Sequence, residues 1–128
     1  MSKLKCIREY FSSGKLMYEY YEDELSRRTG LLRHWHENGQ LMLEVNYLNN
    51  LVEGVSKTYT ENGVLIIYQE FISGKLNGVY KSWFDDGTRK EDGLYMNDIR
   101  QLGYKWYKPN GDLWHILDET DVEKFNLK

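Results

Sequence analysis

Five copies of one short pattern run through the chain, and this pattern constrains the fold more than any other feature. Each copy has a glycine preceded by Ser, Asn or Asp, with an aromatic residue four positions before the glycine. The glycines are Gly14, Gly39, Gly63, Gly87 and Gly111, at spacings of 25, 24, 24 and 24 residues. The aromatic residues are Tyr10, Trp35, Tyr59, Trp83 and Tyr107. A registered repeat of this length indicates a stack of similar supersecondary units.

Each unit has the pattern of a β-hairpin. Asn38-Gly39 and its equivalents are dipeptides favoured in type I′ turns, whose two central residues both need positive φ. The residues that follow alternate between apolar and polar types, which is the period of a strand. One face is expected to carry Leu41, Leu43, Val45 and Tyr47. Second turns are expected at Asn49-Asn50, Ser73-Gly74 and Asn97-Asp98.

The hairpin register can be predicted by centring each two-residue loop on its turn dipeptide. This places Arg33 opposite Glu44 and Trp35 opposite Met42. The equivalent charged pairs are Arg8 with Glu19 and Lys81 with Asp92. Opposite charges on facing strand positions stabilise a sheet mildly, so these pairs support the register. Lys57 and Lys105 would instead face Tyr68 and Ile116, which makes them the freer charges.

These observations predict an all-β fold, an elongated antiparallel meander or solenoid-like sheet of about ten strands. At about 4.8 Å per strand the sheet would span roughly 48 Å. The 128 residues form one domain, with repeats at about 6–29, 30–53, 54–77, 78–101 and 102–117. Residues 118–128 are expected to cap the array, because Thr120 to Glu123 resembles a capping box before a short helix. Val122 and Phe125 would then close the last hairpin.

Composition excludes several classes of function and bears on location. The net charge is -3, which argues against nonspecific nucleic-acid binding and, less strongly, against docking on anionic lipid. Cys6 is the single cysteine, so no intrachain disulfide can form, and we expect this residue to be buried in a strand. The N-terminus has no apolar core of signal-peptide length, and no apolar run is long enough to span a membrane. We therefore expect a cytoplasmic protein.

The repeat units resemble a known family. They read WHENGQLMLEVNYLNNLVEG, YTENGVLIIYQEFISGKLNG and WFDDGTRKEDGLYMNDIRQLG, and they resemble the MORN-repeat variant family over roughly residues 10 to 117. The units also resemble the bacterial YwqK-type proteins, which are antitoxins. The resemblance implies a protein-binding role as an antitoxin or immunity-type partner, and it supplies no catalytic residues. The chain departs from the pattern at Leu102, where a glycine belongs, and at Arg89, where a strand leucine recurs.

Partner-binding candidates come from the same repeat positions. The aromatic ladder, which comprises Tyr10, Trp35, Tyr59, Trp83 and Tyr107, could pack on neighbouring side chains or anchor a partner. The basic residues could hold an acidic partner or phosphate groups, but most are expected to pair with acids across strands. Lys57 and Lys105 remain the freer charges. A second aromatic ladder of Tyr47, Phe71 and Tyr95 is expected to be structural, because it shares a face with Leu43 and Val45.

No catalytic or metal-binding constellation is recognisable. The chain has no nucleophile elbow, P-loop or zinc-binding helix motif, and we expect no enzyme activity, no cofactor and no bound metal. His34, His36 and His115 are too few and too dispersed to predict a metal site. The leading hypothesis is a non-enzymatic module that binds another protein, a toxin or effector that it neutralises. The alternatives are a membrane-surface or phospholipid-docking module and a scaffold component of a larger assembly, with the oligomeric state left open.

Overall fold

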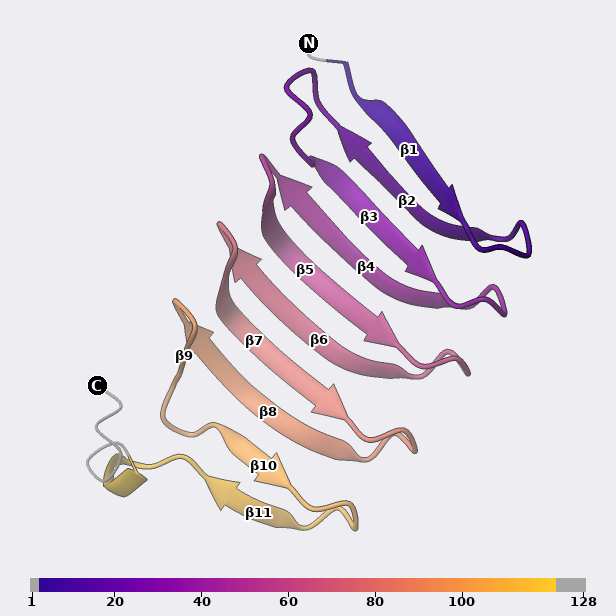
Figure 1. Cartoon of the computed structure of the whole chain (residues 1–128). Helices are drawn as coiled ribbons and strands as arrows, with labels where there is room; N and C mark the ends of the chain where they lie inside the picture. Colours follow the sequence, from indigo (N-terminus) through magenta and orange to yellow (C-terminus); the bar gives the residue numbers. More distant parts are fainter. Residues whose placement is uncertain (1–2, 122–128) are drawn as a thin grey trace.

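A computed structural model describes residues 3–121 as one open, 11-stranded antiparallel sheet (Figure 1). The strands follow the order β1-β2-β3-β4-β5-β6-β7-β8-β10-β11, with β9 beside β8. Their bounds are Lys5–Tyr10 (β1), Leu16–Glu22 (β2), Gly30–Trp35 (β3), Leu41–Leu48 (β4), Leu51–Tyr59 (β5), Leu65–Ile72 (β6), Lys75–Trp83 (β7), Arg89–Met96 (β8), Ile99–Arg100 (β9), Lys105–Tyr107 (β10) and Leu113–Ile116 (β11). The predicted antiparallel meander is therefore confirmed.

The type I′ turns occur at the second set of turns, not at the Asn-Gly set where the sequence predicted them. At Asn38-Gly39 only the glycine has positive φ, 90°, and its N–H donates to the His36 carbonyl at 2.9 Å. This is a type I turn closed by a glycine bulge, not the expected type I′ turn. The type I′ turns lie at the second set, where Asn49 and Asn50 have φ of 49° and 71°.

A second bulge, at Met42, corrects the predicted strand faces next to the turn. Trp35 pairs with Leu41 and His34 with Leu43, so Met42 is the extra residue and does not face Trp35. Leu41 therefore lies on the face of Trp35, while Leu43 lies on the opposite face with His34. The expectation that Leu41 and Leu43 share a face was wrong, because a bulge breaks the strict alternation of a strand.

The long strands bend at a second recurrent glycine. Gly54 in β5 has φ of 84° and Gly78 in β7 has φ of 118°, and the register shifts beside both residues. Positive φ at a bulge curves the strand, and Figure 1 shows both strands curved along their length. In the last repeat Leu102 takes this position and Gly103 follows it, and the equivalent strand is split into β9 and β10. The departure from the repeat pattern thus breaks a strand.

Few side chains are buried because a single sheet has no second layer to cover it. Among residues 3–121 the buried residues are Leu32, Val45, Ser56, Ser82, Tyr104 and Leu117. Three of them form one cross-strand row, in which Leu32 pairs with Val45 and Val45 pairs with Ser56. Most strand residues are only half-buried, so stability comes from nearest-neighbour contacts along the array, as in other solenoids.

The expected short C-terminal helix is present, and it begins earlier than the predicted capping box. A short helix starts at residue 119, and Asp118 and Asp121 form a reciprocal capping box. The Asp121 N–H donates to Asp118 Oδ1 at 3.1 Å, and the Asp118 N–H donates to Asp121 Oδ2 at 3.0 Å. The box expected at Thr120 to Glu123 was displaced by two residues, because Asp118 also caps well. Val122 and Phe125 lie outside the described residues.

Cys6 is exposed in β1, at one edge of the sheet, so the expected burial was wrong. An edge strand of a one-layer sheet has neighbours on one side only, which leaves this small side chain uncovered.

Among residues 3–121, no helix is long and apolar enough to cross a membrane.

Candidate functional site

A row of paired residues crosses the sheet from β1 to β11 on one face. We call it the charged row; it comprises Arg8, Glu19, Arg33, Glu44, Lys57, Tyr68, Lys81, Asp92, Lys105 and Ile116. Each member is the register partner of the next, and directly paired residues share a face of a sheet. Basic residues alternate with acidic ones except at Tyr68 and Ile116. The five hairpin pairings predicted for this row are therefore all confirmed.

Two members of the charged row form ion pairs with their partners. Arg8 Nε lies 2.9 Å from Glu19 Oε2, and Arg33 Nε lies 2.9 Å from Glu44 Oε2. In residues 3–121, Lys57, Lys81 and Lys105 have no carboxylate within ion-pairing distance. Arg8–Glu19 is an exposed pair and Arg33–Glu44 a half-buried one. Solvent still reaches both pairs, so each contributes only about 0.2–1 kcal/mol to stability.

The neighbouring hairpin changes the interpretation of Lys57 and Lys105. Each pairs with an acidic residue on its other side, Lys57 with Glu44 and Lys105 with Asp92. The interpretation of both lysines as facing no acid was incomplete, because it considered only the partner within the same hairpin. Both lysines do face Tyr68 and Ile116 as predicted.

The aromatic ladder lies on the same face as the charged row. Its members end β1, β3, β5, β7 and β10, each two residues after a basic member of the row, and residues two apart in a strand share a face. Tyr10 is 57% exposed, and the other four are half-buried. Arg89 stacks over the Tyr107 ring with its guanidinium carbon 5.4 Å from the ring centre. All seven predicted binding residues thus share one face.

Two shallow hollows indent this face on either side of Tyr68. One, of about 430 Å³, is lined by Glu44, Lys57, Tyr68 and neighbouring residues. The other, of about 380 Å³, is lined by Tyr68, Val79, Lys81 and Trp83. Tyr68 and Val79 were not among the predicted binding residues, although the place of Tyr68 in the charged row was the signal that could have identified it.

The opposite face carries a second set of aromatic rings that pack on one another. The rings of Tyr80 and Tyr95 lie 5.5 Å apart, and those of Tyr95 and Tyr104 lie 5.6 Å apart edge to face. Arg100 lies over this cluster, 5.1 Å from the Tyr104 ring centre. Burial raises the pKa of both Tyr80 and Tyr104 above the usual tyrosine value. Tight packing of these rings indicates a structural role, like that predicted for Tyr95.

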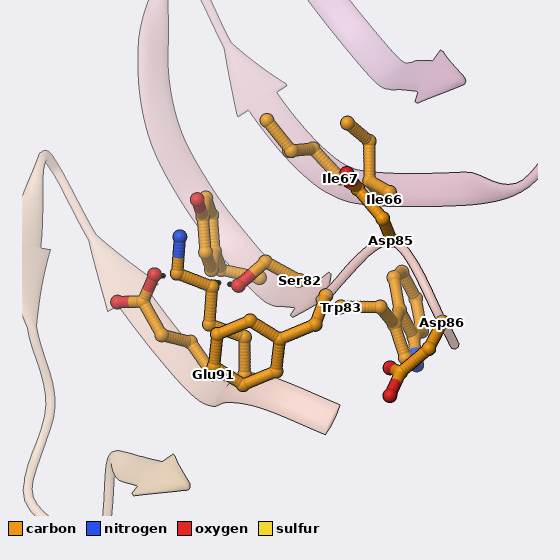
Figure 2. Close-up of a pocket in the computed structure, with 10 residues that line it drawn as sticks. Ile66, Ile67, Ser82, Trp83, Asp85, Asp86 and Glu91 are labelled. Carbon is orange, nitrogen blue, oxygen red and sulfur yellow. Dashed lines mark hydrogen bonds between the residues drawn. The ribbon is translucent and has the colours of Figure 1, made fainter. Parts of the chain in front are cut away.

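A third depression, of about 490 Å³, lies near the turn between β7 and β8 (Figure 2). Ile66 and Ile67 line one part of it, and the Ser82 hydroxyl donates to Glu91 Oε2 at 3.3 Å within it. Its Asp86 accepts a hydrogen bond from the Thr88 N–H at 2.8 Å, and this backbone contact lowers the pKa of Asp86. Both carboxylates therefore make structural hydrogen bonds that hold neighbouring segments.

The three histidines occupy separate environments. His34 stacks on Tyr18 with ring centres 4.0 Å apart, and its pKa is lowered by burial and by the nearby His36. His36 Nε2 lies 3.0 Å from the Tyr59 carbonyl oxygen, and His115 Nε2 lies 2.8 Å from Asp121 Oδ2. Within residues 3–121, no three His, Cys, Asp or Glu side chains are grouped so that they could hold a metal ion.

Comparison with known proteins identifies the repeat in part of the chain. The MORN repeat variant family matches residues 28–49 and residues 52–72, which contain β3, β4, β6 and most of β5. No curated protein matches the chain significantly. MORN repeats are generally modules that bind proteins or membranes.

Proposed function

We propose that the chain is a non-enzymatic, cytoplasmic protein-binding module that uses the face bearing the charged row and the aromatic ladder. One observation carries the proposal: the sheet gathers five regularly spaced aromatic side chains and a net-basic row on the same face. Aromatic side chains are favoured anchors of protein interfaces, and flanking charges orient the partner.

The form of this face favours a protein over a small ligand. Its hollows are shallow and open, whereas small-molecule sites bury most of their ligand in a cleft. The aromatic ladder forms a broad strip that a partner can cover, with Tyr10 exposed and the other four members half-buried. We further propose, from the resemblance to YwqK-type proteins, that the partner is a toxin or effector that the module neutralises.

Affinity purification of the tagged chain from its native cell, followed by mass spectrometry, tests this proposal. We expect one stoichiometric protein that is toxic when expressed alone and harmless when expressed together with the chain. A stoichiometric partner without toxicity would reject the antitoxin role and retain protein binding. Recovery of the chain without any partner would contradict the proposed function.

Docking on a membrane surface is the alternative that MORN repeats allow, and the electrostatics of the sheet disfavour it. Glu19, Glu44 and Asp92 alternate with the basic residues of the charged row, and anionic lipid favours an uninterrupted basic surface. Flotation with phosphatidylserine vesicles at low salt distinguishes the two functions. We expect the chain to remain in the soluble fraction, whereas flotation would support the alternative.

A further inference from the structure

The charged row has a gap where its alternation fails in the middle of the sheet. Tyr68 occupies a position between Lys57 and Lys81 where the pattern of the row calls for an acid. Lys57 is half-buried, Lys81 is exposed, and neither has a carboxylate within ion-pairing distance among residues 3–121. The two lysines therefore face each other across one uncharged side chain.

The nearest acidic residue on the same strand does not fill the gap. Glu70 Oε1 accepts a hydrogen bond from the Val79 N–H at 2.7 Å, and its Oε2 accepts one from the Tyr68 hydroxyl at 2.8 Å. Both oxygens of this carboxylate are occupied by contacts that fix the bulge at Gly78 and the Tyr68 ring. Among residues 3–121, Glu70 forms an ion pair with neither Lys57 nor Lys81.

The surface around the gap can accommodate an apolar side chain in addition to a carboxylate. The hollows on the two sides of Tyr68 meet at its ring, so an extended segment could cross from one to the other. The hollow beyond Tyr68 presents Val79 and the Trp83 ring beside Lys81, an apolar surface next to a cation. Such a surface accepts an apolar side chain that neighbours a carboxylate in the same segment.

We propose that the partner inserts an Asp or Glu side chain over Tyr68, between Lys57 and Lys81, and places a neighbouring apolar side chain against Val79 and Trp83. The inserted carboxylate restores the alternation of the charged row across the interface. The inference rests on the proposed function and names the chemistry that the partner supplies, an acidic protein segment with an adjacent apolar residue. Glu44 and Glu53 line the hollow beside Lys57, and Asp92 pairs with Lys81. These acids repel an extended anionic surface, so the site favours a single inserted carboxylate.

The test uses NMR titration of the whole chain with a short synthetic peptide carrying one Glu between two Val residues, and with its twin carrying Gln. We expect the Glu peptide to bind at least about fivefold more tightly than the Gln twin, a ratio that about 1 kcal/mol of charge pairing gives. Shifts should centre on residues 57, 68 and 81. Equal binding, or shifts centred elsewhere, would overturn the inference.

Matched variants separate the gap from general charge. Lys57→Gln/Lys81→Gln should abolish the preference for the Glu peptide, whereas Lys15→Gln/Lys75→Gln, which removes the same charge at two exposed positions next to turns, should retain it. If both variants lose the preference equally, the inference is overturned. It is also overturned if phosphatidylserine vesicles compete with the Glu peptide and remove the preference. A purified partner protein that binds the wild type and Lys57→Gln/Lys81→Gln equally would overturn it and leave the proposed function intact. The absence of any partner would remove the proposed function itself.

Discussion

Tyr104 fills the space beside Gly93 that a side chain would otherwise occupy. Gly93 ends a cross-strand row that also contains Leu32, Val45, Ser56, Gln69 and Tyr80. It is the one member of this row without a side chain. A Cβ at Gly93 would overlap the Tyr104 ring and lie 2.9 Å from its Cα. Tyr104 is 0% exposed, and its hydroxyl donates to Glu91 Oε1 at 3.0 Å. This contact joins the broken last repeat to β8.

Replacing Gly93 should therefore weaken the end of the sheet. Gly93→Ala should lower the free energy of unfolding by about 1–3 kcal/mol, because the added methyl group overpacks against a buried ring and its backbone. The adjacent Leu94→Ala, at a 54% exposed side chain, should cost less than about 1 kcal/mol. Urea denaturation of both variants measures the difference, and equal losses would contradict the packing described for Tyr104.

The two turn types predict different responses to alanine. At Asn62-Gly63 only Gly63 has positive φ, 83°, so Gly63→Ala should cost about 1–2 kcal/mol and Asn62→Ala less than about 0.5 kcal/mol. At Asn49-Asn50 both residues have positive φ, so either alanine should cost about 1 kcal/mol or more. Thermal and urea unfolding of the four variants provide the comparison. Equal costs at Asn62 and Gly63 would indicate a type I′ turn there.

Register was predictable from the sequence, whereas turn type was not. The pairing of Arg33 with Glu44 follows from the repeat spacing and from the opposite charges. This pairing is unchanged although the loop differs by one residue from the predicted one. The Asn-Gly dipeptide suits a type I′ turn, yet it also suits a type I turn with a glycine bulge, because both need positive φ at the glycine. The turn has the glycine bulge, and a further bulge at Met42 restores the predicted pairing of Arg33 with Glu44. Neither bulge has a distinct signal in a single alternating strand.

His34 should make stability depend on pH near neutrality. Burial and then His36 lower its pKa below the usual 6.5, so the unfolded chain binds the proton first as the pH falls. The contribution of His34 to stability is therefore full above about pH 6.5 and is lost as the pH falls from there through the folded-state pKa. His34→Phe keeps a ring against Tyr18 and should remove this component. Urea unfolding between pH 7.5 and 5.5 measures it, and identical slopes for both proteins would contradict the assignment.

The candidate site was predictable as a set of residues but not as a surface. The repeat spacing identified the aromatic ladder, and strand alternation together with the register places it beside the charged row. The importance of Tyr68 depends on Lys57 and Lys81, which lie on its two neighbouring strands. Pairing within one hairpin shows only one of these neighbours, so the gap becomes visible only when the hairpins are joined into a sheet.

The central claim is that a partner protein binds the face of the aromatic ladder. The most direct measurement is isothermal titration calorimetry of the co-purified partner with Trp35→Ser/Trp83→Ser, and with Tyr47→Ser/Phe71→Ser as the matched change on the opposite face. Circular dichroism and the unfolding midpoint establish that both variants are folded. Because each buried interface anchor contributes about 2 kcal/mol or more, the first variant should bind at least about a hundredfold more weakly and the second within about threefold of the wild type. Unchanged binding by folded Trp35→Ser/Trp83→Ser would contradict the account.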